Sequence, residues 1–147
     1  MLLKNEGETE ILAKKLVKLS KKDNAVICLN GDLGSGKTTF TRYFIRNFFK
    51  SLEIKEIPSP TFTLLQVYEN DSHTINHYDF YRLKNSSELF ELNFGEAVTD
   101  DVCLIEWSDK FEEILPNDRI EINFQIKSKV SRSVQITLKG KFKNQKY

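Results

Sequence analysis

The sequence predicts an α/β fold, with a mixed sheet that has parallel core strands, an antiparallel margin and flanking helices. Three observations support this prediction. The apolar run at residues 25–29 has the length and composition of a buried parallel strand. A glycine-rich turn and an amphipathic helix follow that run directly. Residues 120–126 and 134–138 alternate apolar and polar side chains on either side of a polar turn, which is typical of an antiparallel hairpin.

The length of 147 residues favours one domain with one core. We assign the domain to residues 1–140 and expect residues 141–147 to form a basic, frayed C-terminal tail. A net charge of +1 gives no indication of a nucleic-acid or membrane partner. Basic side chains do gather between Lys127 and Lys146, where no acidic residue occurs. A solvated sheet edge and tail explain them better than an RNA-binding or partner-binding patch.

The two cysteines, Cys28 and Cys103, both lie in apolar runs. We expect them to be small buried hydrophobic residues and not a disulfide or a metal site. The chain leads from Met1 directly into charged residues without a signal peptide, and no apolar run approaches the roughly 20 residues that a membrane span needs. The expectation is a cytoplasmic protein with no membrane partner.

The glycine-rich turn has the spacing G-x-x-x-x-G-K-T of a phosphate-binding loop. Its functional positions are Gly31, Gly34, Ser35, Gly36, Lys37, Thr38 and Thr39. Glycines let the backbone N–H groups curl around a polyphosphate, and the following helix directs its positive end at the same anion. Lys37 supplies a cation for the β- and γ-phosphates, and the Thr38 hydroxyl is a hard ligand for Mg²⁺. Together with the strand and helix around it, this motif predicts a P-loop NTPase-like domain.

The helices on either side of this unit follow from apolar spacing. Residues 8–19 are predicted to form an amphipathic helix, and residues 20–24 a turn. The apolar face of this first helix comprises Ile11, Leu12, Leu16 and Leu19. The helix that starts at Thr38 places Phe40, Tyr43, Phe44 and Phe48 on one face.

A rigid loop is predicted at residues 57–63, because Pro58 and Pro60 forbid a helix there. The loop delivers Thr61 to a defined place and leads into a strand at residues 64–68. Such a loop resembles a switch region that senses the γ-phosphate, although an ordinary loop before a strand explains the spacing equally well.

The next strand is expected at residues 73–80, after a hairpin turn at 70–72. It carries Asp79 among large aromatic residues, where a carboxylate needs a cation or several hydrogen-bond donors. Mg²⁺, a bound water or an ion pair with Arg82 could satisfy it. His77 is interpreted as a structurally satisfied core or edge histidine and is given no role.

A short helix at residues 86–92 precedes the strand at 101–107, which has four apolar residues followed by Glu106. An acid at the tip of a parallel strand beside the P-loop is a Walker B arrangement, so Glu106 is the first choice for the metal-site carboxylate and Asp79 the second. An exposed strand-end acid is the alternative for Glu106. Trp107 could pack in the core or cover a nucleotide or a partner. A helix at 108–115 then leads into the C-terminal hairpin, which turns at 127–131.

Four motifs now stand in order along the chain. They are G-D-L-G-S-G-K-T-T-F at 31–40, P-S-P-T-F-T-L at 58–64, H-Y-D-F-Y-R-L at 77–83 and E-W at 106–107. Their order and spacing resemble the TsaE (YjeE) family, and the resemblance runs from about Thr9 to Gly140.

The resemblance implies a bacterial ATPase that acts in biosynthesis of N6-threonylcarbamoyladenosine (t6A) in tRNA. Such ATPases use ATP and Mg²⁺, work with the proteins TsaB and TsaD, and meet tRNA only indirectly. By the same resemblance, residues 34–39 bind phosphates, and Thr38 and Glu106 hold Mg²⁺. Thr61, Asp79 and Trp107 match positions at the site. The resemblance also marks two outlying nucleotide contacts, Thr9 and Arg132.

The predicted catalytic set is therefore Lys37, Thr61, Asp79 and Glu106. Slow hydrolysis alone and faster hydrolysis with partners is expected, because no arginine is plainly placed as a finger. The alternatives are a P-loop small-molecule kinase, disfavoured because no arginine-rich lid segment occurs, and a nucleotide-sensing scaffold that does not need hydrolysis. A GTPase is disfavoured because the chain has no N-K-x-D motif.

Overall fold

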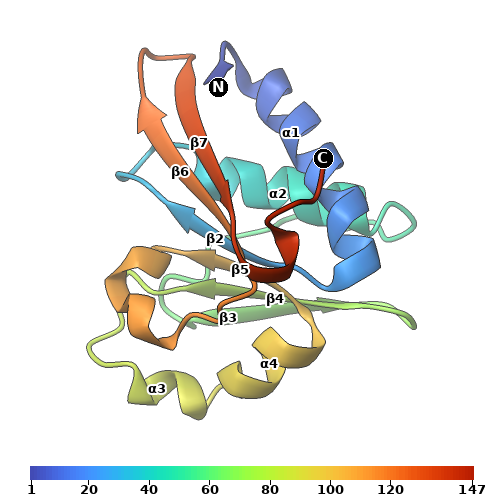
Figure 1. The fold of residues 1–147 in the computed structure, drawn as a ribbon, viewed down its shortest axis with the longest axis vertical. Helices are drawn as coiled ribbons and strands as arrows, with labels where there is room; N and C mark the ends of the chain where they lie inside the picture. The colour runs from blue at the N-terminus through green and yellow to red at the C-terminus, as the bar shows by residue number, and fades with distance from the viewer.

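The computed structural model describes residues 1–147 and contains one mixed seven-stranded sheet (Figure 1). The strand order is β1-β7-β6-β2-β5-β4-β3. The strands are β1 (Leu2–Leu3), β2 (Val26–Asn30), β3 (Leu65–Glu69), β4 (Thr74–Asp79), β5 (Val102–Glu106), β6 (Ile120–Ile126) and β7 (Arg132–Leu138).

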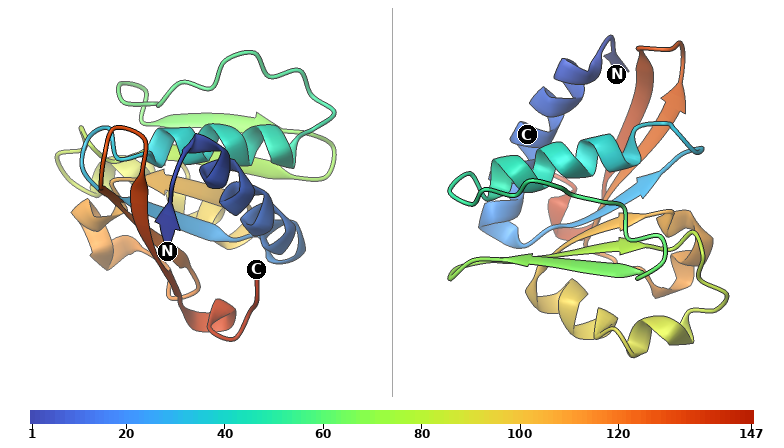
Figure 2. Two further views of the ribbon diagram at one scale, coloured as in Figure 1. Left: turned by 90° about the horizontal axis from the view of Figure 1, so that it is seen from above. Right: turned by 180° about the vertical axis from the view of Figure 1, so that it is seen from behind.

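The helices cover both faces of this sheet (Figures 1 and 2). They are α1 (Glu6–Asp23), α2 (Lys37–Phe48), α3 (Ser87–Phe90) and α4 (Phe94–Asp100), with two 3₁₀ helices, η1 (Ser108–Ile114) and η2 (Gly140–Phe142). α1 and α2 pack against each other on one face, whereas α4 contacts β5 from the other. Seen from behind, α2 lies across the strands, and the segment between α2 and β3 returns along it (Figure 2). None of the helices combines the length and apolar character that a membrane crossing requires.

The predicted parallel core is confirmed. β2 pairs in parallel with β5 on one side and β6 on the other, and β4 pairs in parallel with β5. Antiparallel pairs form both margins of the sheet, through β3 with β4 and through β7 with β6. The sequence analysis did not predict β1, which adds to β7 as a two-residue edge strand and is too short to show an alternating pattern.

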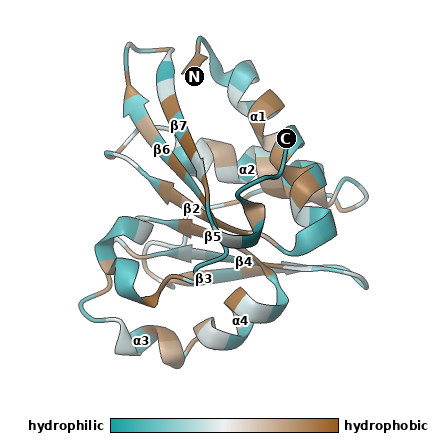
Figure 3. Cartoon of the chain, in the orientation of Figure 1, coloured by the Kyte–Doolittle hydropathy of each residue, from teal (hydrophilic) through white to brown (hydrophobic).

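The central strands bury alternate side chains in two separate cores. On β2, Ile27 and Leu29 join the core under α1 and α2, whereas Val26 and Cys28 join the core under α3 and α4. Cys103 on β5 lies in the second core beside them. Both thiols are free and fully buried, as predicted, and burial raises the pKa of Cys28 to about 12. Teal and brown alternate along β6 and β7, because only one face of this hairpin is buried (Figure 3).

The helices differ from the prediction in four details. α1 continues through residues 20–23, which were predicted as a turn, and ends where Asn24 adopts a left-handed conformation with φ 39°. Ile11, which was assigned to its apolar face, is 56% exposed because the buried stripe runs through Leu12, Ala13 and Leu16. α4 was not predicted, and the helix expected at 108–115 is the 3₁₀ helix η1.

The C-terminal segment is attached to the core by one aromatic side chain. Phe142 is fully buried in the core under α1 and α2, although it lies in the segment 141–147 that was expected to fray. Its aromatic ring provides the apolar area that the neighbouring lysines lack. The division of the chain at residue 140 remains a prediction, but the packed part of the chain extends at least to Phe142.

We predict that Phe142→Ala lowers the free energy of unfolding by about 3–5 kcal/mol, because it leaves a cavity in a close-packed core. Chemical denaturation monitored by circular dichroism measures this change. Tyr147→Ala is the matched control, because Tyr147 is 39% exposed and should give a change below about 1 kcal/mol. A change for Phe142→Ala as small as that for the control would show that the tail is not part of the core.

Candidate nucleotide-binding site

The phosphate-binding loop connects β2 to α2 through backbone conformations that require glycine. Gly31 has φ 139°, and a Cβ there would lie 2.5 Å from the Phe124 carbonyl oxygen. Gly36 has φ 113° and is the N-cap of α2. Residues with a Cβ rarely adopt these conformations, so the two glycines fix the path that brings the loop around to the N-terminus of the helix.

A cavity of about 250 Å³ lies against this loop. It is lined by Leu33, Gly34, Ser35, Gly36, Lys37, Thr38, Thr39, Ser59, Thr61, Asp79, Tyr81, Glu106 and Trp107. The fold thus brings together most of the predicted site residues, from the loop, the 57–63 segment and the ends of β4 and β5. Of the predicted set, Gly31, Thr9 and Arg132 do not line this cavity.

Lys37 is a buried cation at the base of this cavity, with only 5% of its surface exposed. Its Nζ donates to the carbonyl oxygen of Gly31 and to that of Asp32, the latter at 2.9 Å. Nζ also lies 4.0 Å from the centre of the Trp107 ring. Burial lowers the pKa of Lys37 below its ordinary value, although the charges of Glu106 and Asp79 act to raise it. An anion that enters the cavity would therefore meet a cation held by weak backbone acceptors.

The two carboxylates of the site are neighbours in the sheet. Asp79 and Glu106 end β4 and β5 and pair directly in the parallel register. They are 3% and 2% exposed. The Ser59 hydroxyl lies between them, 2.7 Å from Asp79 Oδ2 and 3.3 Å from Glu106 Oε2. The 57–63 loop is therefore hydrogen-bonded to both carboxylates.

Asp79 is satisfied by donors other than Arg82. Its Oδ2 accepts the Thr61 hydroxyl at 3.3 Å, and its Oδ1 accepts the Tyr81 backbone N–H at 2.9 Å. The ion pair considered for Arg82 is absent, because its guanidinium stacks on the ring of Phe62, 4.1 Å from the ring centre. Of the two ways in which Asp79 was expected to be satisfied, a cation or several donors, the structure shows hydroxyl and backbone donors.

Glu106 joins the P-loop helix to the centre of the sheet. The Thr38 hydroxyl donates to Glu106 Oε1 at 2.6 Å, and His77 Nε2 lies 2.6 Å from Oε2. Burial opposes ionisation of Glu106, but the hydrogen bonds from His77 and Thr38 and the charge of Lys37 outweigh it and hold its pKa below the ordinary value. The lowered pKa favours the ionised form of Glu106 beside the P-loop threonine, and its role as a Walker B acid stays a prediction.

Sequence reasoning gave no role to His77 or Ser59. His77 lies in the pattern Ile75-x-His77-x-Asp79, which places its side chain on the same face of β4 as Asp79. That alternation was the available signal for His77. Ser59 carried no comparable signal, because its contacts depend on how the loop folds back.

The donor set suits Mg²⁺. Thr38 Oγ1 and a Glu106 oxygen are hard ligands that already lie within 2.6 Å of each other. No group of three or more His, Cys, Asp or Glu side chains forms a complete metal site in this protein. Mg²⁺ typically takes one or two protein oxygens and completes its shell with water and substrate phosphates, so a two-residue protein contribution fits this ion.

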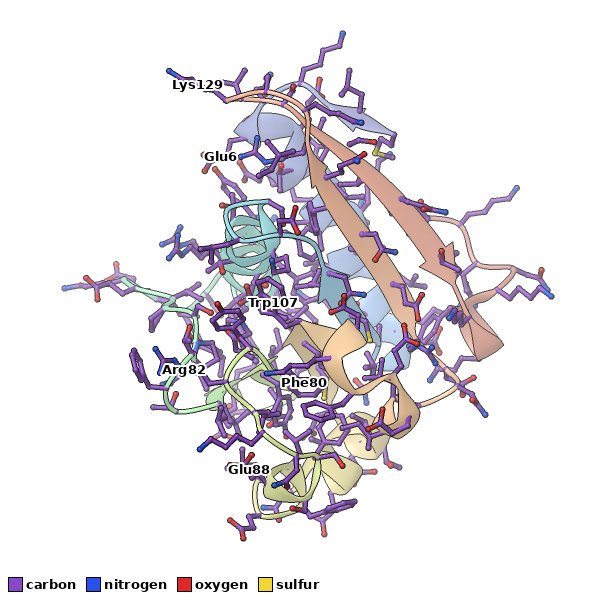
Figure 4. All side chains as sticks on the ribbon, turned by 90° about the vertical axis from the view of Figure 1, so that its left-hand side faces the viewer. Glu6, Phe80, Arg82, Glu88, Trp107 and Lys129 are labelled. Atoms are coloured by element: carbon purple, nitrogen blue, oxygen red, sulfur yellow. The ribbon has the colours of Figure 1, made fainter.

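A second cavity of about 210 Å³ adjoins the first, since Gly36 and Thr39 line both. Its remaining walls are Asn5, Glu6, Thr9, Lys129, Val130 and Arg132. Figure 4 labels Trp107 at the first cavity and Glu6 and Lys129 at the second, on the side of the β6–β7 turn. Thr9 and Arg132, the two outlying residues, therefore come together next to the loop.

Arg132, on β7, forms hydrogen bonds with the P-loop. Its Nε donates to the Ser35 carbonyl at 3.0 Å, and its NH2 to that of Gly34 at 3.1 Å. Its NH1 donates to the carbonyls of Ser128 and Ser131, each at 2.9 Å. The same guanidinium thus ties the β6–β7 turn to the phosphate-binding loop.

The fold and the site define a P-loop nucleotide-binding protein. A family model described as "Threonylcarbamoyl adenosine biosynthesis protein TsaE" matches residues 3–134. The chain therefore belongs to the TsaE family, as its motifs predicted.

Relatives and a solved structure agree with this assignment. A protein of Rickettsia felis, named tRNA threonylcarbamoyladenosine biosynthesis protein TsaE, is 47% identical over 126 residues, which cover 86% of this chain and 72% of the relative. A protein of the same name from Bacillus subtilis is 36% identical over 140 residues, covering 92% and 83%. The crystal structure of Bacillus subtilis YdiB superposes with a TM-score of 0.66 at 31% identity, covering 95% of this chain and 84% of that one.

The contact between Lys37 and Trp107 predicts an optical signal for anion binding. Trp107 is the single tryptophan of the chain. Phosphates that draw Lys37 Nζ toward them should change the Trp107 emission in a saturable way, because the cation leaves the ring face. Fluorescence titration with ATP measures this, and Lys37→Met is the control that should show little response. An equal response of wild type and Lys37→Met would mean that the lysine does not move to the ligand.

Proposed function

We propose that this protein is a Mg²⁺-dependent ATPase that supports t6A modification of tRNA together with TsaB and TsaD, meeting tRNA only through that assembly. The observation that carries the proposal is the hydrogen bond from Thr38 to Glu106 beside the buried Lys37. A phosphate cradle, a cation and a metal-site carboxylate thereby occur within one cavity.

The P-loop performs the binding step. Its backbone N–H groups and the N-terminus of α2 receive the phosphate oxygens, and Lys37 exchanges its carbonyl partners for the β- and γ-phosphates. Thr38 and Glu106 would hold Mg²⁺, which, when bound, neutralises charge on the phosphates. Ser35 and Thr39 line the same cavity and complete the phosphate contacts.

Asp79 orients or deprotonates the attacking water, and the Thr61 hydroxyl senses whether the γ-phosphate is present. The support is that Asp79 is buried at the cavity and already accepts hydrogen bonds from Thr61 and Ser59 of the loop. A loop held by these bonds changes its contacts when a ligand competes for the same hydroxyls. We therefore assign the 57–63 loop as a switch.

The second cavity receives the nucleoside end of ATP. It continues the first cavity past Gly36 and Thr39, in the direction of Thr9 and Arg132. Arg132 keeps the loop closed on this side through the carbonyls of Gly34 and Ser35. The position of Thr9 and Arg132 in the lining of the second cavity supports both as nucleotide contacts.

Hydrolysis is slow without partners, because no arginine of the chain lines the first cavity. Each one is already engaged: Arg42 and Arg46 by carbonyls of residues 57 and 55, Arg82 by Phe62, Arg119 by Glu121 and Arg132 by the loop. Charge that develops on the γ-phosphoryl group therefore lacks the mobile cation that speeds many P-loop enzymes. TsaB and TsaD supply the missing stabilisation in this proposal.

The proposal predicts slow ATP hydrolysis by the protein alone, a higher rate with TsaB and TsaD, and a further change when tRNA is added. Phosphate release measured under the three conditions tests this. Glu106→Gln should lower the stimulated rate by about 100-fold, because it removes the ionised oxygen next to Thr38. Glu113→Gln is the matched control, since Glu113 is exposed and does not line the cavity.

The same variant distinguishes an ATPase from a nucleotide-sensing scaffold. If Glu106→Gln lacks hydrolysis but supports full t6A formation while Lys37→Ala supports none, binding alone is the function. A phosphorylated small-molecule product in place of free phosphate would instead indicate a kinase.

A further inference from the structure

His77 is the one histidine of the chain that lies inside the core. It is fully buried, and its Nε2 is 2.6 Å from Glu106 Oε2. The other ring nitrogen, Nδ1, is buried without any hydrogen-bond partner. The imidazole therefore makes a single polar contact, and that contact is with the site carboxylate.

The strand register creates this contact. His77 pairs with Leu104, and Asp79 pairs with Glu106, so His77 lies two residues before the carboxylate pair on the same face of the sheet. From there its ring reaches diagonally to Glu106. The two ends of the Glu106 carboxylate are thereby divided, with Oε1 toward Thr38 and Oε2 toward His77 and Ser59.

The direction of the hydrogen bond follows from its partners. An ionised carboxylate only accepts hydrogen bonds, so the hydrogen is on His77 Nε2. Nδ1 has no partner, so the bond to Glu106 is the only hydrogen bond that orients the ring. A short bond to a charged acceptor in a dry core is stronger than a neutral one and fixes the orientation of both groups.

A purely structural role explains these features less well. Leu or Phe would fill a fully buried position without leaving a polar nitrogen unpartnered. Neighbours on the same face of the sheet, Ile75 on β4 and Leu104 on β5, are apolar and belong to the core. A histidine at this place is useful if the orientation of the carboxylate matters.

We propose that His77 is a positioning residue that holds the Glu106 carboxylate with Oε1 beside Thr38 and so increases the affinity of the nucleotide-loaded site for a divalent metal ion. This inference rests on the proposed function, since it assumes that Thr38 and Glu106 hold Mg²⁺. Residues behind metal ligands act in this way when they restrict the ligand to one orientation. Nucleotide binding without metal does not depend on His77 in this account.

Three variants test the role. His77→Gln places an amide N–H near the position of Nε2 and keeps the bond, whereas His77→Asn is too short to reach Glu106. His77→Leu removes all polar function. The probe is Mn²⁺, whose free concentration is measured by electron paramagnetic resonance with saturating ADP, and ADP affinity is measured separately in EDTA.

We expect His77→Asn and His77→Leu to weaken Mn²⁺ binding by about 10–100-fold, and His77→Gln to stay within about threefold of wild type. ADP affinity in EDTA should be unchanged in all three. Unchanged Mn²⁺ affinity in folded His77→Asn overturns the inference, and so does an equal loss in His77→Gln. If wild type with ADP binds no Mn²⁺, the proposed function fails instead.

A second measurement needs no substitution at His77. The chain has only two histidines, so ¹⁵N-histidine labelling gives two ring systems, and His73→Gln assigns them. We expect His77 to carry a hydrogen on Nε2, and its Nε2 signal to shift when Mg²⁺ and ADP are added while the His73 signals do not. A bare Nε2, or no response of His77 to Mg²⁺, overturns the inference even if the variants do not fold.

Discussion

The site depends on surrounding two buried carboxylates with hydrogen-bond donors and cations where they lie side by side at the ends of β4 and β5. Each is almost fully buried, and like charges so close together are costly unless donors and cations surround them. The carboxylates are stabilised by the charge of Lys37 and by hydrogen bonds with the hydroxyls of Thr38, Ser59 and Thr61 and with His77. Because these donors come from the P-loop helix, the 57–63 loop and β4, the carboxylates connect three separate parts of the chain.

The sheet supplies the geometry that this arrangement needs. Alternate residues of β4 and β5 face α1 and α2, so the series Ile75, His77 and Asp79 passes from the apolar core to the cavity. Glu106 ends the same face of β5, directly beside Asp79. The apolar part of this face packs against α2, and the polar part stands opposite the N-terminus of that helix. The apolar residues of this face thus stabilise the fold, and the polar residues at its end form the site.

Much of this was predictable from the sequence, for identifiable reasons. The P-loop and Glu106 are recognised by local spacing, and the strands beside them are strong apolar runs, so the fold and the position of these residues at one cavity could be predicted. β1 and α4 were missed because their patterns are too short or too weak. His77, Ser59 and Arg82 were missed or wrongly partnered because their contacts are set by strand register and loop folding. Phe142 was assigned to a frayed tail because the segment around it is rich in lysine, although this one aromatic residue is buried in the core.

The most direct test of the account is whether magnesium strengthens nucleotide binding through Thr38. Calorimetric titration of a non-hydrolysable ATP analogue, with Mg²⁺ and then with EDTA, measures this in wild type and in Thr38→Val. The account predicts that Mg²⁺ increases the wild-type affinity by about tenfold or more and that Thr38→Val loses this increase. Equal wild-type affinities with Mg²⁺ and with EDTA would contradict it.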